Sequence, residues 1–218
     1  MNFRVKSDKL PTIFLENAEI RYILKKNDMN YIAEVIESST TQFTAQAREL
    51  NGSPPFGAFV KVGVSPTAVA MISDIVTGST ELNRRPVAYG KTEEELREEQ
   101  PQIFELLRTE ITATIVGYAD ERGMKQCLPP QPPRLHSFVY CCAPEEICEF
   151  TGYFDYFRIL IGVGGTLSDE LMIAAVQQTC ACHGNAGRSW FIRAGKELSR
   201  LLRDDYDRLE SILRRVTI

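Results

Sequence analysis

Between residues 31 and 142 the chain contains short segments rich in apolar and β-branched residues, and residues 43–47 alternate apolar and polar with the two-residue period of a half-buried β-strand. The predicted strands cover residues 32–36, 43–47, 56–64, 69–76, 111–118 and 138–142, with a shorter extended piece at 87–89. Turn residues separate them, and Gly78 and Ser79 are expected to end the strand that starts at Val69. Short strands at this spacing predict a small antiparallel barrel or sandwich.

From residue 143 onward the apolar positions recur at helical spacing. The predicted helices cover residues 144–161, 168–182 and 189–216. Gly152 can split the first helix, and Ser168 is the expected N-cap of the second because its hydroxyl can accept from an orphan backbone N–H. The third is predicted to be one long amphipathic helix of about 40 Å. The expected fold class is therefore α+β, a small β-barrel followed by a C-terminal helical domain.

An acidic helical insert interrupts the strands at residues 92–109. Thr92 and Glu95 have the spacing of a capping box, in which each side chain accepts from the backbone N–H of the other. Pro101 cannot continue the first helix and suits the start of a second. Residues 92–110 contain seven acidic residues and two arginines, a net charge of −5, which favours a solvated helix face. The chain then divides into an N-terminal lead (1–30), the barrel with its insert (31–142) and the helical domain (143–218).

Composition and charge exclude several classes of function. The 218 residues carry a net charge of −4, with 44% hydrophobic and 25% charged residues, as in an ordinary globular protein. Nucleic-acid-binding domains are usually basic, so direct binding of nucleic acid is not expected. No apolar run reaches the ~20 residues that cross a bilayer, and Asp8 and Lys9 stand where a signal peptide would be apolar. We therefore expect a cytoplasmic protein without membrane insertion, whose six cysteines are reduced.

Three short motifs resemble binding sites, and each departs from the required pattern. Gly90-Lys91-Thr92 ends like a P-loop, but Arg85 occupies the position of the necessary glycine. Gly162–Gly165 resembles a dinucleotide fingerprint, but Leu167 stands where its third glycine belongs. Cys180, Cys182 and His183 are close enough in sequence to share a metal, but their spacing is poor for zinc. We expect no cofactor, no bound metal and no catalytic constellation.

Two sets of residues are candidate protein contacts. Arg84 and Arg85 precede Pro86 in a predicted exposed loop, where two guanidinium groups can bind carboxylates through paired hydrogen bonds. Three interpretations stay open, which are an acidic partner, the acidic insert of the same or a neighbouring chain, and a purely solvated loop. The second set lies at the end of the predicted long helix, where the apolar stripe can extend past the two shorter helices. Its members are Leu209, Ile212, Leu213 and Val216.

Residues 32–138 carry a combination of motifs that resembles the HAS-barrel family (the HerA–ATP synthase barrel), in the stand-alone form of photosynthetic bacteria. The matching segments are Ile32–Ala45, Pro54–Gly57, Gly78-Ser79, Arg84–Pro86, Glu94–Leu96, Gln100–Ile103 and Leu128–Pro130. The resemblance implies an antiparallel barrel of six short strands with no active site of its own. In larger relatives this barrel precedes an ATPase motor, caps a hexameric ring and receives partner proteins. This chain has no P-loop, so the resemblance implies docking or assembly without motor function.

These observations predict a non-enzymatic docking or assembly module that acts through protein–protein contacts, as an accessory to an ATP-driven or DNA-processing complex. Its expected partner is an unidentified protein, with self-association as a further option. The alternative is a small enzyme whose site is assembled from residues distant in sequence, around Cys182 and His183. A polar pocket with strongly shifted pKa values would favour the enzyme, whereas a large exposed apolar patch would favour the docking module.

Overall fold

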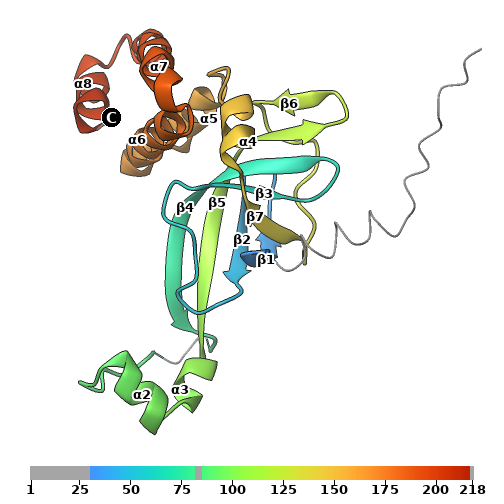
Figure 1. The fold of residues 1–218 in the computed structure, drawn as a ribbon, viewed down its shortest axis with the longest axis vertical. Helices are drawn as coiled ribbons and strands as arrows, with labels where there is room; N and C mark the ends of the chain where they lie inside the picture. Colours follow the sequence, from blue (N-terminus) through green and yellow to red (C-terminus); the bar gives the residue numbers. More distant parts are fainter. Residues whose placement is uncertain (1–29, 82–84, 217–218) are drawn as a thin grey trace, which may run out of the picture. The chain divides into compact units, whose positions relative to one another are not determined.

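Six antiparallel strands close into a barrel (Figure 1). The structure is a computed structural model and describes residues 30–81 and 85–216. The barrel strands are β1 (Ala33–Ser38), β2 (Gln42–Ala47), β3 (Phe59–Val62), β4 (Thr67–Ser79), β5 (Leu107–Asp120) and β7 (Phe138–Cys141). They are hydrogen-bonded in the order β2-β1-β7-β3-β4-β5, and a further pairing of β2 with β5 closes the ring. The predicted α+β class with a six-stranded antiparallel barrel is confirmed.

Side-chain alternation divides the strand residues between two separate cores. In β3, Val60 and Val62 point into the barrel, whereas Phe59 points outward to the helices. Ala68 and Ala70 of β4 likewise point inward. Alanine supplies six of the fourteen buried residues of the barrel interior. Small side chains are needed there because the interior of a barrel with so few strands is narrow.

The hairpin of β4 and β5 is longer than the sequence predicts. Gly78 lies opposite Arg108 and Ser79 lies opposite Leu107, so β4 continues through the dipeptide that was expected to end it. Backbone pairing with β5 stabilises the extended conformation there, which outweighs the weak strand preference of glycine. A short strand, β6 (Gly123–Lys125), extends β5 into a second hairpin that was not predicted. Residues 87–89, predicted as extended, contain no strand.

Five helices and one short 3₁₀ helix follow the barrel and pack on its outer face. They are α4 (Pro144–Phe150), α5 (Tyr156–Val163), α6 (Gly165–Cys182), η1 (Gly184–Ala186), α7 (Gly187–Leu201) and α8 (Tyr206–Arg215). α6 is central, because it contacts α4, α5, α7 and α8 as well as β4. Outward-facing barrel residues, among them Phe59, Met71 and Val116, belong to the same buried cluster as Leu171 and Trp190 of the helices.

The chain divides into two units, Met1–Asn30 and Tyr31–Ile218. The predicted boundary at residue 142 is the change from strands to helices, but barrel and helices belong to the same unit. The shared core explains why they are not separate. Among the described residues, no helix combines the length and the apolar character needed to span a bilayer.

Two glycines make the close contact between barrel and helices possible. A Cβ at Gly57 would lie 2.3 Å from the Cβ of Ala174 on α6, and Gly57 also has a φ of +81°, which favours glycine. A Cβ at Gly117 of β5 would lie 2.3 Å from the carbonyl oxygen of Lys125 and 2.6 Å from the ring of Phe150 on α4. The absence of a side chain at both positions lets the helices approach the sheet directly.

The C-terminal half of the helical domain differs in detail from the prediction. The range 189–216 is mostly helical and amphipathic, but the chain leaves the helix after α7 and starts α8 at Tyr206. Asp205 caps α8, since its side chain accepts from the backbone N–H of Arg208 at 3.3 Å, as is typical of an N-cap aspartate. Ser168 is not the N-cap of α6, which begins at Gly165. Its buried hydroxyl accepts a hydrogen bond from Arg208 instead.

Candidate functional site

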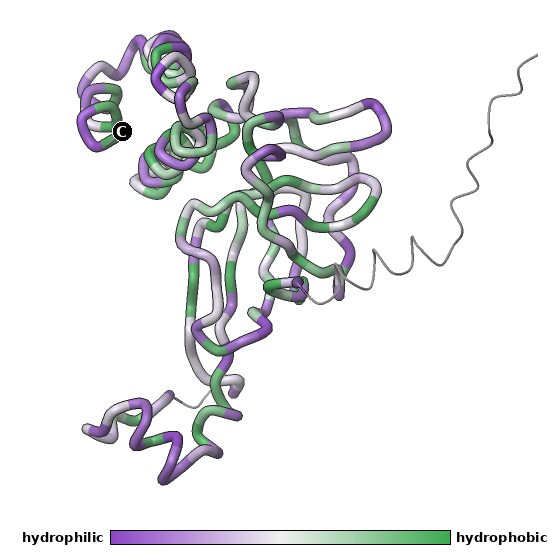
Figure 2. Tube along the Cα trace, in the orientation of Figure 1, coloured by the Kyte–Doolittle hydropathy of each residue, from purple (hydrophilic) through white to green (hydrophobic). Residues whose placement is uncertain are grey.

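The segment between β4 and β5 carries two short helices, α2 (Glu93–Glu99) and α3 (Gln102–Glu105). We call residues 85–106 the arm. Neither helix contains a buried residue, and Figure 2 shows α2 mainly in the hydrophilic colours. The arm contains six glutamates and three basic residues, a net charge of −3. The arm is therefore a charged projection that contributes little to either core.

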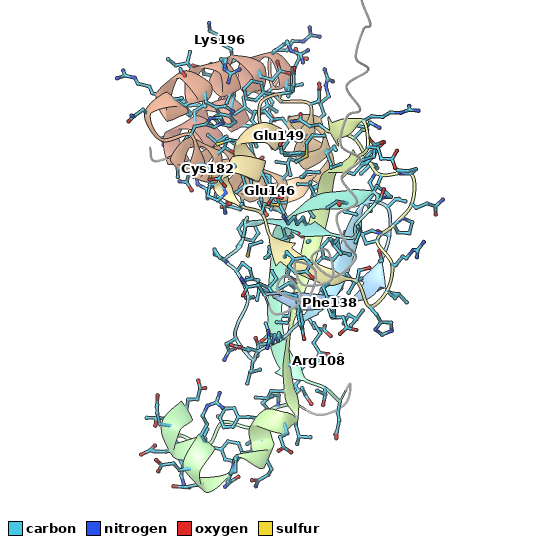
Figure 3. All side chains as sticks on the ribbon, turned by 45° about the vertical axis from the view of Figure 1, so that its right-hand side comes forward. Arg108, Phe138, Glu146, Glu149, Cys182 and Lys196 are labelled. Carbon is cyan, nitrogen blue, oxygen red and sulfur yellow. The ribbon has the colours of Figure 1, made fainter. Side chains whose placement is uncertain are left out.

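Hydrogen bonds hold the base of the arm in a fixed geometry. The N–H of Thr80 donates to the carbonyl of Leu106 at 2.9 Å, and the hydroxyls of Thr77 and Thr109 are 2.8 Å apart. The N–H of Asn51 donates to the same Thr109 hydroxyl at 2.8 Å, which connects the β2–β3 loop to this point. Figure 3 labels Arg108 at the neck where β5 meets the arm. These hydrogen bonds fix the end of the hairpin from which the arm projects.

Local interactions explain why α2 forms without a core. The predicted capping box is confirmed, because the N–H of Glu95 donates to the Thr92 hydroxyl while the N–H of Thr92 donates to the Glu95 carboxylate. Arg97 forms an ion pair with Glu93 one turn earlier at 2.7 Å, and Lys91 forms one with Glu99. Such pairs stabilise isolated helices modestly. The acidic composition predicted a solvated face here, which agrees with the exposure of α2 but does not distinguish its paired carboxylates from its unpaired ones.

Arg85 lies in the arm, where it lines a shallow pocket of about 80 Å³ between the incoming chain and α3. The other lining residues are Ser79, Pro86, Val87, Tyr89, Ile103, Leu106 and Leu107. Val87 is 69% exposed and Tyr89 is 45% exposed, so the pocket rim is apolar and accessible. Arg84, the other predicted contact in this loop, lies outside the described residues. The structure therefore places one predicted contact residue on the arm, next to apolar side chains.

The second predicted contact set is largely used for packing within the chain. Leu209 is 7% exposed and Ile212 is 1% exposed, and both belong to the helical core. Leu213 and Val216 are half-buried and pack against that core. These apolar side chains are covered because the chain turns between α7 and α8 and brings α8 back against α6. An uncovered end, as expected for a single long helix, is not what the structure shows.

Ion pairs fix α8 in this position. The Arg208 guanidinium donates to the Asp169 carboxylate at 2.7 Å and to the buried Ser168 hydroxyl at 2.8 Å, both on α6. Arg215 forms an ion pair with Glu170 on the same helix at 2.6 Å. Sequence reasoning missed these contacts because the partners are about 40 residues apart.

The chemistry around Cys182 and His183 is unfavourable for the alternative enzyme. Burial raises the pKa of the Cys182 thiol, with further contributions from Cys148 and Glu145, whereas a thiol nucleophile needs a lowered pKa. Burial, together with the charge of Arg193, lowers the pKa of His183. Its ring stacks on Trp190 at 5.8 Å and its buried Nε2 has no hydrogen-bond partner. Cys182 packs against the helical core and His183 against Trp190, and no hydrogen bond joins the Cys182 thiol to a base among the described residues.

Three further cysteines are poor nucleophiles because burial raises the pKa of their thiols. All six thiols are free. Burial raises the pKa of Cys142 to about 12, and the nearby Glu146 carboxylate adds to the shift. Burial also raises the pKa of Cys141 and of Cys180. Within residues 30–81 and 85–216, no group of three or more His, Cys, Asp and Glu side chains is arranged to hold a metal ion.

The fold by itself does not identify a family, because small barrels occur in many unrelated proteins. The resemblance of residues 32–138 to HAS-barrel proteins therefore stays an expectation from the sequence. Comparison with known proteins adds no relative: no protein-family model matches the chain, and no curated protein is significantly similar to it.

Proposed function

We propose that this protein is a non-enzymatic docking module that binds another protein through the arm. The observation that carries the proposal is that α2 and α3 bury no residue of their own, although the arm projects from a hydrogen-bonded hairpin. The helices at the end of the β4–β5 hairpin add no buried residue to either core. A role as an accessory of a larger ATP-driven or DNA-processing complex is the narrower form of the same proposal.

The arm has the two kinds of surface that a protein contact requires. Apolar side chains, including Val87 and Tyr89, are exposed beside the shallow pocket, and protein interfaces place such residues at their centre. Unpaired glutamates on α2 form a charged rim. Charge at the rim of an interface mainly sets specificity and the rate of encounter. The partner is therefore expected to carry a basic surface with an apolar side chain that enters the pocket.

An armless variant tests the proposal directly. Ser79 and Leu107 lie opposite each other, so residues 80–106 can be replaced by Asn-Gly, a two-residue turn that suits antiparallel strands. In native cell extract, the intact chain should elute in a larger assembly during size-exclusion chromatography, and the armless chain should elute as the free protein. A melting temperature within about 4 °C of the intact chain would show that the barrel and helices are preserved. Identical elution of both chains would overturn the proposal.

A photoreactive residue provides the matched control. Gln102 on α3 and Glu121 in the β5–β6 turn are both exposed. A benzophenone side chain at position 102 should give a covalent adduct in cells, and the same side chain at position 121 should not. Equal adducts at both positions would indicate non-specific contact.

A further inference from the structure

The exposed face of α7 is a basic surface that nothing in the described chain covers. α7 contains Arg188, Arg193, Lys196 and Arg200 against a single acidic residue, Glu197, a net charge of +3. All four basic side chains are exposed, and Figure 3 shows Lys196 at the outer side of the helical domain. Among the described residues, Arg188 and Lys196 form no ion pair. An apolar side chain, Ile192, is 53% exposed on the same helix.

The basic residues of α7 and the acidic residues of the arm are spaced alike. Glu94 and Glu98 lie one turn apart on α2, are exposed and have no ion-pair partner among the described residues. Two like charges four residues apart destabilise a helix on its own. Lys196 and Arg200, of which Arg200 also forms an ion pair with Glu197, are four residues apart as well, so both pairs are separated by about 6 Å along their helices. Two carboxylates on one helix can therefore face two cations on the other.

The arm does not reach α7 of its own chain. The helical core includes Met71 of β4, and β4 continues for eight more residues to Ser79 at the base of the arm. At about 3.3 Å per residue, these positions are separated by about 26 Å along the strand. No hydrogen bond or ion pair of the described chain joins residues 85–106 to α4–α8. Any contact between the two surfaces must therefore come from another molecule.

We propose that the arm of one copy docks on the exposed face of α7 of a second copy. The inference rests on the proposed function of the arm and names its partner as this same chain. Glu94 and Glu98 face the cations of α7, and Ile192 of the second copy meets the apolar side chains beside the arm pocket. Because the two surfaces differ, the contact is head-to-tail and generates a ring if it closes or a chain of copies if it does not.

A second copy fits this face better than a polyanion does. The basic residues occupy one helix of fifteen residues, and acidic residues border them directly. Glu197 lies within the helix and forms an ion pair with Arg200, and Asp205 and Asp207 follow the helix beyond the Arg203–Asp204 ion pair. A nucleic acid or an anionic membrane extends past such a patch and meets these carboxylates. The acidic helix α2 has only seven residues, so it covers a shorter length of α7 than an extended polyanion does.

Charge exchange on the purified full-length chain tests the inference. By light scattering, the mass of the unchanged chain should rise with concentration, and association should weaken at least about tenfold between about 0.05 M and 0.5 M salt because exposed charges are screened. Glu94→Lys with Glu98→Lys should abolish association, as should Arg188→Glu with Lys196→Glu. An equimolar mixture of the two variants should associate again, since each then carries the charge that the other lacks. Glu121→Lys, outside both surfaces, is the control and should leave association unchanged.

Two results would overturn the inference. One is a chain that stays monomeric at every concentration, or two variants that fail to associate when mixed although circular dichroism shows both to be folded. The other is binding of duplex DNA or phosphatidylserine vesicles that is lost in Arg188→Glu/Lys196→Glu and kept in Glu94→Lys/Glu98→Lys, which would assign the face to a polyanion. Neither result affects the comparison of intact and armless chains in cell extract, so failure of self-association is distinguishable from failure of arm docking.

Discussion

The arm and the C-terminal domain are both helical, but their helices exist for different reasons. α2 has a capping box and an i,i+4 ion pair and buries nothing. α5, α6 and α7 have no side-chain cap hydrogen bond, yet together they bury residues such as Phe157, Leu171 and Trp190. Local contacts support the first helix and tertiary packing supports the others. The side chains of α2 therefore stay outside both cores, whereas each of the C-terminal helices α5, α6 and α7 contributes side chains to the core.

The largest expected effect follows from removing the main aromatic side chain of the helical core. Trp190 is 1% exposed, and its indole N–H donates to the carbonyl of Thr151 at 2.8 Å. Trp190→Ala should lower the free energy of unfolding by about 3–5 kcal/mol, because it leaves a cavity and an unpaired carbonyl. Urea denaturation measures this change. Tyr153→Ala, at a position that is 76% exposed, should change it by less than about 0.5 kcal/mol. Similar costs for the two variants would contradict the assignment of Trp190 to the core.

The next effect concerns the contact that brings α8 back onto α6. Arg208→Met removes hydrogen bonds to Asp169 and to the buried Ser168. We expect a loss of about 1–3 kcal/mol in the free energy of unfolding, the range for hydrogen bonds to charged groups. Arg203 forms an ion pair with Asp204 in which both side chains are more than three quarters exposed. Arg203→Met is therefore the control and should cost almost nothing. A cost for Arg203→Met that equals the cost at Arg208 would show that α8 is held in another way.

A substitution in the arm should act locally. Thr92→Ala removes the capping hydroxyl and should destabilise α2 by about 1 kcal/mol. Hydrogen exchange at the backbone N–H of Glu95 and Leu96 should then accelerate about fivefold or more, the rate equivalent of that energy. The midpoint of global urea unfolding should stay unchanged, since α2 buries nothing. Thr92→Ser, which keeps the hydroxyl, should behave as the original chain. A shift of the global midpoint in Thr92→Ala would mean that the arm belongs to the cooperative core.

The smallest effect is a pH dependence at the junction of barrel and helices. Glu146 on α4 forms an ion pair with Lys61 on β3 and accepts from the N–H of Ala143. Burial raises the pKa of this carboxyl, but the hydrogen bonds from Lys61 and Ala143 outweigh burial and lower it below its ordinary value of 4.5. A lowered pKa contributes stability above pH 4.5 that is lost as the pH falls through the folded-state value.

Denaturation at a series of pH values tests this contribution. The free energy of unfolding should fall less steeply below pH 4.5 in Glu146→Gln than in the original chain. Lys61→Met should flatten the same part of the profile, because the carboxyl loses its main charged partner. An unchanged slope in both variants would show that the ion pair does not couple α4 to the barrel.

Local sequence patterns by themselves determined much of this protein. The alternation at residues 43–47 and 111–118 predicted β2 and the middle of β5, and the Thr92–Glu95 spacing predicted the start of α2. These features depend on neighbours within a few residues, so periodicity and capping chemistry are sufficient to find them. The acidic composition of the insert likewise predicted a solvated surface. The sequence therefore predicted the exposed helical insert that forms the arm, but it did not predict that this insert lies at the end of a long hairpin.

Tertiary structure decided the features that depend on distant partners. β4 extends through Gly78 because Arg108, thirty residues later, lies opposite it. The stripe from Leu209 to Val216 is covered because the chain turns after α7 and Arg208 binds Asp169 on α6. No local pattern encodes either contact, because each is formed between segments that meet only after the barrel and α6 are in place. The same physical reason explains why Leu209 and Ile212 are buried whereas Arg85, in the other predicted contact set, is exposed on the arm, since exposure depends on what the rest of the chain covers.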